Sequence, residues 1–135
     1  MTNKEPELTL TSVRVLVAED NPAVQAFISR ALSSFGAYVI SVNNGQEALD
    51  ALAHAPYDVL VTDIVMPNVD GIALALQAGR SFPNLRIVMI SGYAQERMRA
   101  HNLDALVHRI IAKPFSLEEI CQAVRDAQNT NTHKS

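Results

Sequence analysis

Residues 59–71 read Val-Leu-Val-Thr-Asp-Ile-Val-Met-Pro-Asn-Val-Asp-Gly, and this stretch decides the fold. Its first four residues are apolar or β-branched, which predicts a short strand with no polar alternation. A strand of this kind needs cover on both faces of the sheet, as helices provide in α/β proteins. Asp63 follows the strand directly, and residues 71–82 have the periodicity of a helix that stops before Pro83. The stretch therefore predicts a buried strand, a polar loop and a covering helix.

The same alternation of strand and helix recurs on both sides of this stretch. Further strands are predicted at residues 13–18, 38–42, 86–90 and 109–112. Further helices are predicted at residues 22–35, 45–53, 95–106 and from 117 onward. Strands that alternate with helices along the chain favour an open, doubly wound parallel α/β sheet with right-handed crossovers.

Several helix ends carry local signals. Asn21 precedes Pro22, which suits a helix start because the missing N–H of proline has no partner there. Gly36 stands where a left-handed residue would end the same helix. Ser116 and Glu119 have the spacing of a capping box, which predicts the start of the last helix.

Length and composition restrict the class of protein. The 135 residues suffice for one domain, and we expect polar tails at 1–11 and 128–135 around a folded unit at 12–127. The net charge of −3 argues against nucleic-acid binding through a basic surface. No apolar run is long enough for a membrane span and no signal peptide is present, so we expect no membrane contact and a cytoplasmic location. The single cysteine, Cys121, lies on the apolar stripe of the last helix and is predicted to be a core residue.

Polar side chains follow four of the predicted strands at the point where each strand ends. They are Glu19 and Asp20, then Asp63, Ser91 and Lys113. The carboxyl ends of parallel strands meet at one edge of a sheet, which is where α/β proteins bind ligands. Three carboxylates that meet in one cleft repel each other unless a cation joins them, and Mg²⁺ is a hard cation that takes oxygen ligands.

Four segments carry a resemblance to a known family. They are Val-Leu-Val-Ala-Glu-Asp-Asn (15–21), Thr-Asp-Ile-Val-Met-Pro-Asn-Val-Asp-Gly (62–71), Met-Ile-Ser-Gly (89–92) and Ala-Lys-Pro-Phe (112–115). Together they resemble the receiver domains of two-component response regulators, over about residues 13–127. The resemblance implies the flavodoxin-like fold, with five strands in the order 2-1-3-4-5 and five helices.

The resemblance also implies roles for the residues at the strand ends. Asp20 and Asp63 would bind Mg²⁺ directly, Glu19 would act through water, and the backbone carbonyl of Val65 would add a ligand. Asp63 would be the phosphoacceptor, and a phosphohistidine of a sensor histidine kinase or phosphotransfer protein would be the donor. The domain would catalyse only its own phosphorylation and dephosphorylation, so we do not expect an enzyme.

Two further residues would act on the phosphoryl group. Lys113 would neutralise charge on its oxygens from two strands away, and the peptide bond from Lys113 to Pro114 would be cis as in the family. The hydroxyl of Ser91 would donate to a phosphoryl oxygen and pull the following loop inward. Such a movement would switch a surface that binds a downstream protein.

This chain departs from the family at the switch. The family usually has an aromatic residue three positions before its lysine, but Ile110 stands there in this sequence. Tyr93, two residues after Ser91, is a candidate to take the place of the aromatic side chain.

Alternative interpretations remain open from the sequence. We favour a single-domain regulator over a receiver cut from a larger response regulator or hybrid kinase. A Mg²⁺-dependent hydrolase is a weaker hypothesis, because a large phosphatase family has its acid–base aspartate where this chain has Val65. A binding module that no longer uses phosphate is the third hypothesis.

Overall fold

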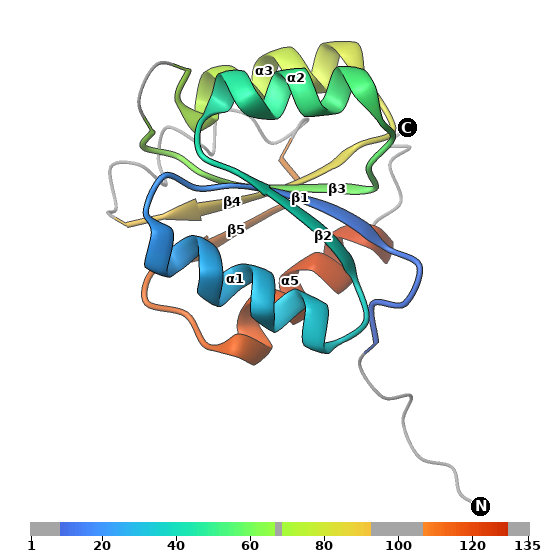
Figure 1. Cartoon of the computed structure of the whole chain (residues 1–135), viewed down its shortest axis with the longest axis vertical. Coiled ribbons are helices and arrows are strands. Elements are labelled where there is room, and N and C mark those ends of the chain that lie inside the picture. The colour runs from blue at the N-terminus through green and yellow to red at the C-terminus, as the bar shows by residue number, and fades with distance from the viewer. Residues whose placement is uncertain (1–8, 67–68, 93–106, 130–135) are drawn as a thin grey trace, which may run out of the picture.

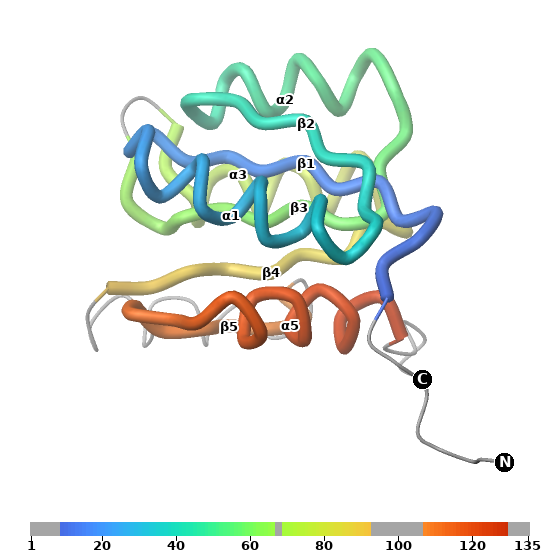
Figure 2. The backbone as a smooth tube through the Cα atoms, turned by 60° about the horizontal axis from the view of Figure 1, so that its bottom comes forward, coloured from blue at the N-terminus to red at the C-terminus, as the bar shows by residue number. Residues whose placement is uncertain are grey.

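Five short parallel strands form a sheet at the centre of the computed structural model, which describes residues 9–66, 69–92 and 107–129 (Figure 1). The strands are β1 (Arg14–Ala18), β2 (Tyr38–Val42), β3 (Val59–Asp63), β4 (Arg86–Ser91) and β5 (Arg109–Ala112). Their order across the sheet is β2-β1-β3-β4-β5, as Figure 2 shows. The predicted doubly wound, flavodoxin-like topology is therefore confirmed.

Helices cover both faces of this sheet (Figure 1). The helices in the described residues are α1 (Pro22–Ser34), α2 (Gly45–His54), α3 (Gly71–Ser81) and α5 (Leu117–Asn129). α1 packs against α5 on one face, and α2 packs against α3 on the other. The helix predicted at 95–106 lies outside the described residues, so four of the five expected helices are observed. None of these four is both long enough and apolar enough to cross a membrane.

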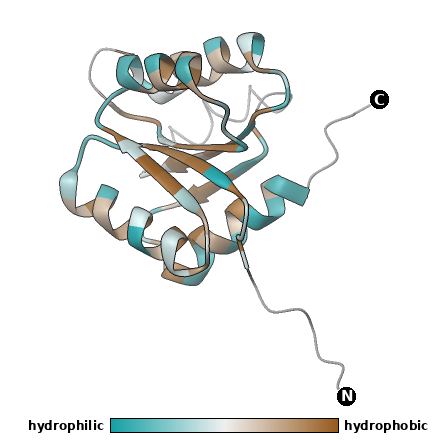
Figure 3. Cartoon of the chain, turned by 45° about the vertical axis from the view of Figure 1, so that its right-hand side comes forward, coloured by the Kyte–Doolittle hydropathy of each residue, from teal (hydrophilic) through white to brown (hydrophobic). Residues whose placement is uncertain are grey.

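Residues of β1 alternate between the two layers. Val15 and Val17 are fully buried on the side of α1 and α5, whereas Leu16 and Ala18 are buried on the side of α2 and α3. The apolar strands consequently form the centre of the molecule in Figure 3. This explains why the strands lack polar alternation, because side chains on both faces of the sheet are covered.

The predicted helix ends are confirmed where the structure describes them. The side chain of Asn21 accepts hydrogen bonds from two backbone N–H groups at the start of α1, and Gly36 has a φ of 103° just after its end. The backbone N–H of Ser116 donates to Glu119, and the N–H of Glu119 donates to the Ser116 hydroxyl.

Described residues inside both predicted tails belong to the folded structure. The polar pattern places Leu10 in a frayed tail, but its side chain is fully buried against the α1–α5 layer, and its backbone N–H donates to the carbonyl of Phe35 at 2.7 Å. At the other end, α5 continues to Asn129, two residues into the predicted tail. The alternation Leu8-Thr9-Leu10-Thr11 is too short to predict an element, which is why the sequence pattern missed Leu10.

Candidate functional site

Three carboxylates meet at the carboxyl edge of the sheet. Glu19 and Asp20 directly follow β1, and Asp63 is the last residue of β3. Because β1 and β3 are hydrogen-bonded neighbours, one carboxylate oxygen from each of the three residues lies within 4.8 Å of the others. Glu19 and Asp63 are 1% and 5% exposed, whereas Asp20 is open to solvent.

Glu19 is the electrostatically strained member of the cluster. Its Oε2 accepts a hydrogen bond from the backbone N–H of Asn21 at 3.0 Å. Its Oε1 is buried and has no hydrogen-bond partner among the described residues. The pKa of Glu19 is raised to about 7, chiefly by burial; the Asn21 N–H and Lys113 lower it, whereas Asp63 and Asp20 raise it.

The cluster has the chemistry of a divalent cation site. Its donors are all oxygens, and Oε1 of Glu19 is buried with no hydrogen-bond partner among the described residues to offset its desolvation. A hard cation such as Mg²⁺ would offset that cost, directly or through one of the several waters that it keeps. Val65 lines the same cavity of about 510 Å³, together with the three carboxylates.

Lys113 reaches the cluster from the far side of β4. It directly follows β5, two strands from β3, and its Nζ lies 3.2 Å from Oδ2 of Asp63. Its backbone N–H donates to the carbonyl of Ser91 at 2.9 Å, and its peptide bond to Pro114 is cis. Because the lysine stem spans the intervening strand, its ammonium group stands beside the carboxylate of Asp63.

Ser91 ends β4 at the same edge. Its register places it one residue beyond Ile90, which pairs with Asp63 across the β3–β4 ladder. The Ser91 side chain is fully buried, and its Oγ has no hydrogen-bond partner among the described residues. The hydroxyl is therefore available to a new acceptor near Asp63.

Close packing of α3 holds the end of β3. The backbone N–H of Gly71 donates to the carbonyl of Ile64 at 2.8 Å, and a Cβ at Gly71 would clash with the carbonyl oxygen of Asp63. No sequence pattern marks this contact in advance, although it explains why a glycine follows the polar loop. Asp70 caps the same helix by accepting from the N–H of Ala73.

Of the two predicted switch residues, Ile110 is among the described residues. Ile110 lies on β5 at the edge of the sheet, where its side chain is partly buried against the α2–α3 layer. Tyr93 lies outside the described residues.

Gln25 on α1 is not singled out by the sequence pattern, yet its side chain contacts the backbone of Glu19.

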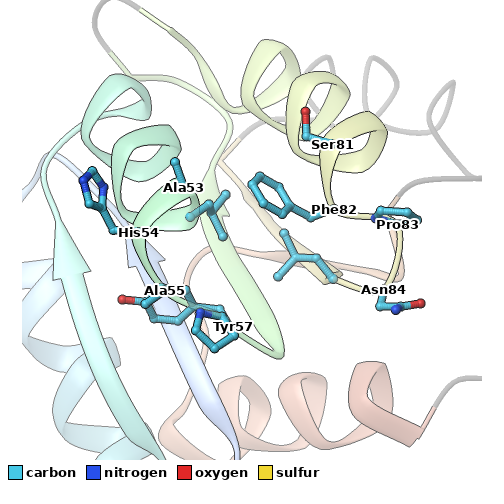
Figure 4. Close-up of a pocket in the computed structure, with 11 residues that line it drawn as sticks. Ala53, His54, Ala55, Tyr57, Ser81, Phe82, Pro83 and Asn84 are labelled. Atoms are coloured by element: carbon cyan, nitrogen blue, oxygen red, sulfur yellow. The ribbon is translucent and has the colours of Figure 1, made fainter.

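A second cavity, of about 540 Å³, lies at the opposite edge of the sheet (Figure 4). It opens between the ends of α2 and α3 and is lined largely by apolar side chains, among them Leu52, Tyr57, Phe82 and Leu85. It has no carboxylate in its lining, as far as the described residues extend. The acidic cluster is therefore the site with chemistry suited to a cation and a phosphoryl group.

Sequence comparison places the chain in a known family. Residues 15–125 match the profile of the response regulator receiver domain. The chain is 34% identical to the response regulator receiver protein CpdR of Brucella abortus over 111 residues, which cover 82% of this chain and 92% of CpdR. It is 36% identical to the response regulator MprA of Mycobacterium tuberculosis over 84% of this chain, but it spans only 50% of MprA.

Structural comparison gives the same fold. A receiver domain from a Francisella response regulator superimposes with a TM-score of 0.78 at 27% identity, over 89% of this chain and all of that domain (100%). The response regulator TrrA of Thermotoga maritima, solved in complex with Mg²⁺–BeF, has a TM-score of 0.78 at 23% identity, over 85% of this chain and 98% of TrrA. The protein therefore belongs to the response regulator receiver family of two-component systems.

Proposed function

We propose that this receiver domain accepts a phosphoryl group on Asp63 in a Mg²⁺-dependent reaction. The observation that carries the proposal is the 3.2 Å contact between Lys113 Nζ and Asp63 Oδ2 beside two further carboxylates. This arrangement puts one cation on a buried carboxylate and leaves room for a second cation on its other side. The two positive charges, of Lys113 and of the metal, would offset the repulsion between a negative phosphoryl group and a negative nucleophile.

The roles proposed within the cluster are those that the resemblance to receiver domains implies. Asp20 and Asp63 would bind Mg²⁺ directly, Glu19 would act through a water, and the carbonyl of Val65 would complete the protein ligands. When bound, the metal would neutralise the carboxylates and the equatorial phosphoryl oxygens. The presence of Mg²⁺–BeF in the TrrA complex supports this assignment.

The transfer itself is a single displacement. A carboxylate oxygen of Asp63 attacks the phosphorus of a phosphohistidine, the P–N bond breaks as the P–O bond forms, and the histidine leaves. Lys113 then keeps its ammonium group on the phosphoryl oxygens. Ser91 donates its hydroxyl to another of them, which gives a partner to the buried Oγ that has none among the described residues.

Receiver domains are phosphoacceptor signalling modules that act with histidine kinases and downstream targets. For this chain we propose a sensor histidine kinase or phosphotransfer protein as donor, a downstream protein as target, and a cytoplasmic location. Direct nucleic-acid binding is not part of the proposal. The chain spans 92% of CpdR but only 50% of MprA, so its relatives differ in how much sequence accompanies the receiver domain.

The test is incubation of the full chain with Mg²⁺ and acetyl phosphate, followed by intact mass measurement. We expect one added phosphoryl group, which is lost in Asp63→Asn and when Mg²⁺ is chelated. Asp126→Asn is the matched control, because Asp126 lies on α5 in an exposed ion pair with Arg109 and should be labelled normally. Equal labelling of Asp63→Asn would overturn the assignment, and lack of labelling in the wild type would favour a module that does not use phosphate.

A further inference from the structure

The side chain of Gln25 connects three oxygens at the edge of the sheet that carries the acidic cluster. Gln25 lies in the first turns of α1. Its Nε2 is 2.9 Å from the carbonyl oxygen of Glu19, 3.0 Å from the carbonyl oxygen of Val42 and 3.0 Å from Oδ1 of Asn43. A single amide group thus joins the end of β1, the end of β2 and the loop after β2.

The first of these bonds acts on the acidic pair itself. The carbonyl of Glu19 belongs to the peptide group that links Glu19 to Asp20. The backbone N–H of Glu19 donates to the carbonyl of Val42 at 3.1 Å, and Val42 also accepts from Gln25. Both peptide groups of Glu19 are therefore held from the same side, which fixes the direction in which the side chains of Glu19 and Asp20 leave the backbone.

Restraint of the Glu19–Asp20 peptide group should favour cation binding at this site. Three carboxylates within 4.8 Å repel each other, so a loosely held chain after β1 would let Asp20 move away from Glu19 and Asp63. An amide donor holds the peptide group without adding a charge of its own. A cation would then find its ligands already in place, and less of its binding free energy would be used to order them.

We propose that Gln25 is a positioning residue that sets the affinity of the acidic cluster for a divalent cation. It acts through the Glu19–Asp20 peptide group and touches neither the metal nor the phosphoryl group. The inference rests on the proposed function only in requiring that the cluster bind Mg²⁺.

The experiment measures Mg²⁺ binding to the unphosphorylated full chain by calorimetry. Gln25→Met keeps the length of the side chain but removes the donor, and we expect the Mg²⁺ Kd to rise about threefold to tenfold, as loss of one hydrogen bond allows. Labelling of the variant by acetyl phosphate should be slower than in the wild type at low Mg²⁺ concentration. It should reach the wild-type rate once Mg²⁺ is saturating. Gln25→Ala, with the higher helix propensity, is the second variant and should give the same shift.

Two controls separate positioning from general loosening. Gln122→Met removes a hydrogen bond of similar length far from the cluster, the exposed bond from Nε2 to Asp126 at 2.9 Å on α5, and should leave the Mg²⁺ Kd unchanged. Asn43→Ala removes one acceptor of Gln25 but leaves the bond to Glu19, and its effect should stay below about twofold.

Each contrary result has a distinct meaning. An unchanged Mg²⁺ Kd in folded Gln25 variants would overturn the inference but not the proposed function, even if the melting temperature fell. An Asn43→Ala effect as large as that of Gln25→Met would also overturn it, since any loosening of this edge would then suffice. A wild-type chain that binds no Mg²⁺ would overturn both the inference and the proposed function.

Discussion

The ammonium group of Lys113 lies 3.2 Å from Oδ2 of Asp63, although the two residues follow strands that are separated by β4. The lysine side chain is about one-third exposed (35%), while that of Asp63 is almost fully buried. The charge of Asp63 is thus offset by a cation that approaches from solvent over the edge of the sheet. This contact explains how a buried aspartate is tolerated beside two other carboxylates.

Replacement of Lys113 by methionine should destabilise the metal-free protein by about 1–2 kcal/mol, because it leaves a buried carboxylate without this cation. The measurement is the free energy of unfolding in urea without divalent ions. Arg109→Met is the matched control: it breaks the 3.0 Å ion pair with Asp126, but both side chains are exposed, so the loss should be below about 1 kcal/mol. Equal losses in the two variants would argue against a special role for the Lys113 contact.

Ser91→Ala should stabilise the unphosphorylated protein by about 1 kcal/mol, because it removes a buried hydroxyl that has no hydrogen-bond partner among the described residues. The same variant should lose part of the structural response to phosphorylation. Thermal unfolding measures the first effect, and NMR shift changes on addition of beryllofluoride with Mg²⁺ measure the second. A lower melting temperature for the unphosphorylated variant would show that the hydroxyl is already satisfied.

The raised pKa of Glu19 predicts the pH dependence of stability without metal. Its pKa is about 7 in the folded protein against an ordinary value of 4.5, so the folded state holds the proton more tightly than the unfolded state. The stabilisation that protonated Glu19 contributes to the folded state is fully present below pH 4.5 and is lost as the pH rises through 7. The loss amounts to at most about 3 kcal/mol. Glu19→Gln should remove this part of the pH profile, and an unchanged slope between about pH 5 and about pH 8 would show that burial of Glu19 is not its cause.

Mg²⁺ should stabilise the folded protein by about 1.4 kcal/mol at roughly ten times its dissociation constant, because the cation binds only the assembled cluster. The melting temperature should therefore rise with Mg²⁺ concentration. Asp20→Asn should shift this rise to higher concentrations, since it removes a proposed carboxylate ligand. A Mg²⁺ dependence identical in wild type and Asp20→Asn would exclude Asp20 as a ligand.

Gly71→Ala should destabilise the protein by about 1–3 kcal/mol, because the added methyl group would have to displace the backbone at Asp63. Labelling of Asp63 should fall as well, since the same backbone carries this proposed phosphoacceptor. Gly79→Ala, in the last turn of α3, is the control and should be neutral or stabilising by up to about 1 kcal/mol through helix propensity. A Gly71→Ala variant that matched Gly79→Ala in stability would contradict the close approach seen in the structure.

Much of the architecture is predictable from local pattern. Strands without polar alternation, such as residues 59–62, predict a sheet covered on both faces, and polar residues such as Asp63 and Lys113 mark its carboxyl edge. The order of the strands, however, follows from the resemblance to a family and not from the pattern itself. Helix ends such as Asn21 and Gly36 are predicted correctly because capping is a short-range effect that involves a few neighbouring residues.

Long-range contacts between single residues are not predictable in this way. The contact of Gly71 with Asp63 depends on how closely a helix approaches a strand end, which no periodicity encodes. Gln25 is an ordinary helix residue until the ends of β1 and β2 supply its acceptors. His108 is similar, because no local pattern indicates that its Nδ1 accepts a hydrogen bond from the backbone N–H of Ile87 at 3.0 Å.

The burial of Cys121 makes this residue a natural probe of local opening of the structure. The only thiol in the sequence is fully buried between α1 and α5, its Sγ contacts the carbonyl of Ala31 at 3.4 Å, and burial raises its pKa to about 11. A thiol reagent can therefore react only when these two helices separate. The rate of thiol modification then measures how often the α1–α5 layer opens. A ligand, a phosphoryl group or a partner that stabilises this layer should slow the modification, which can be measured without an engineered label.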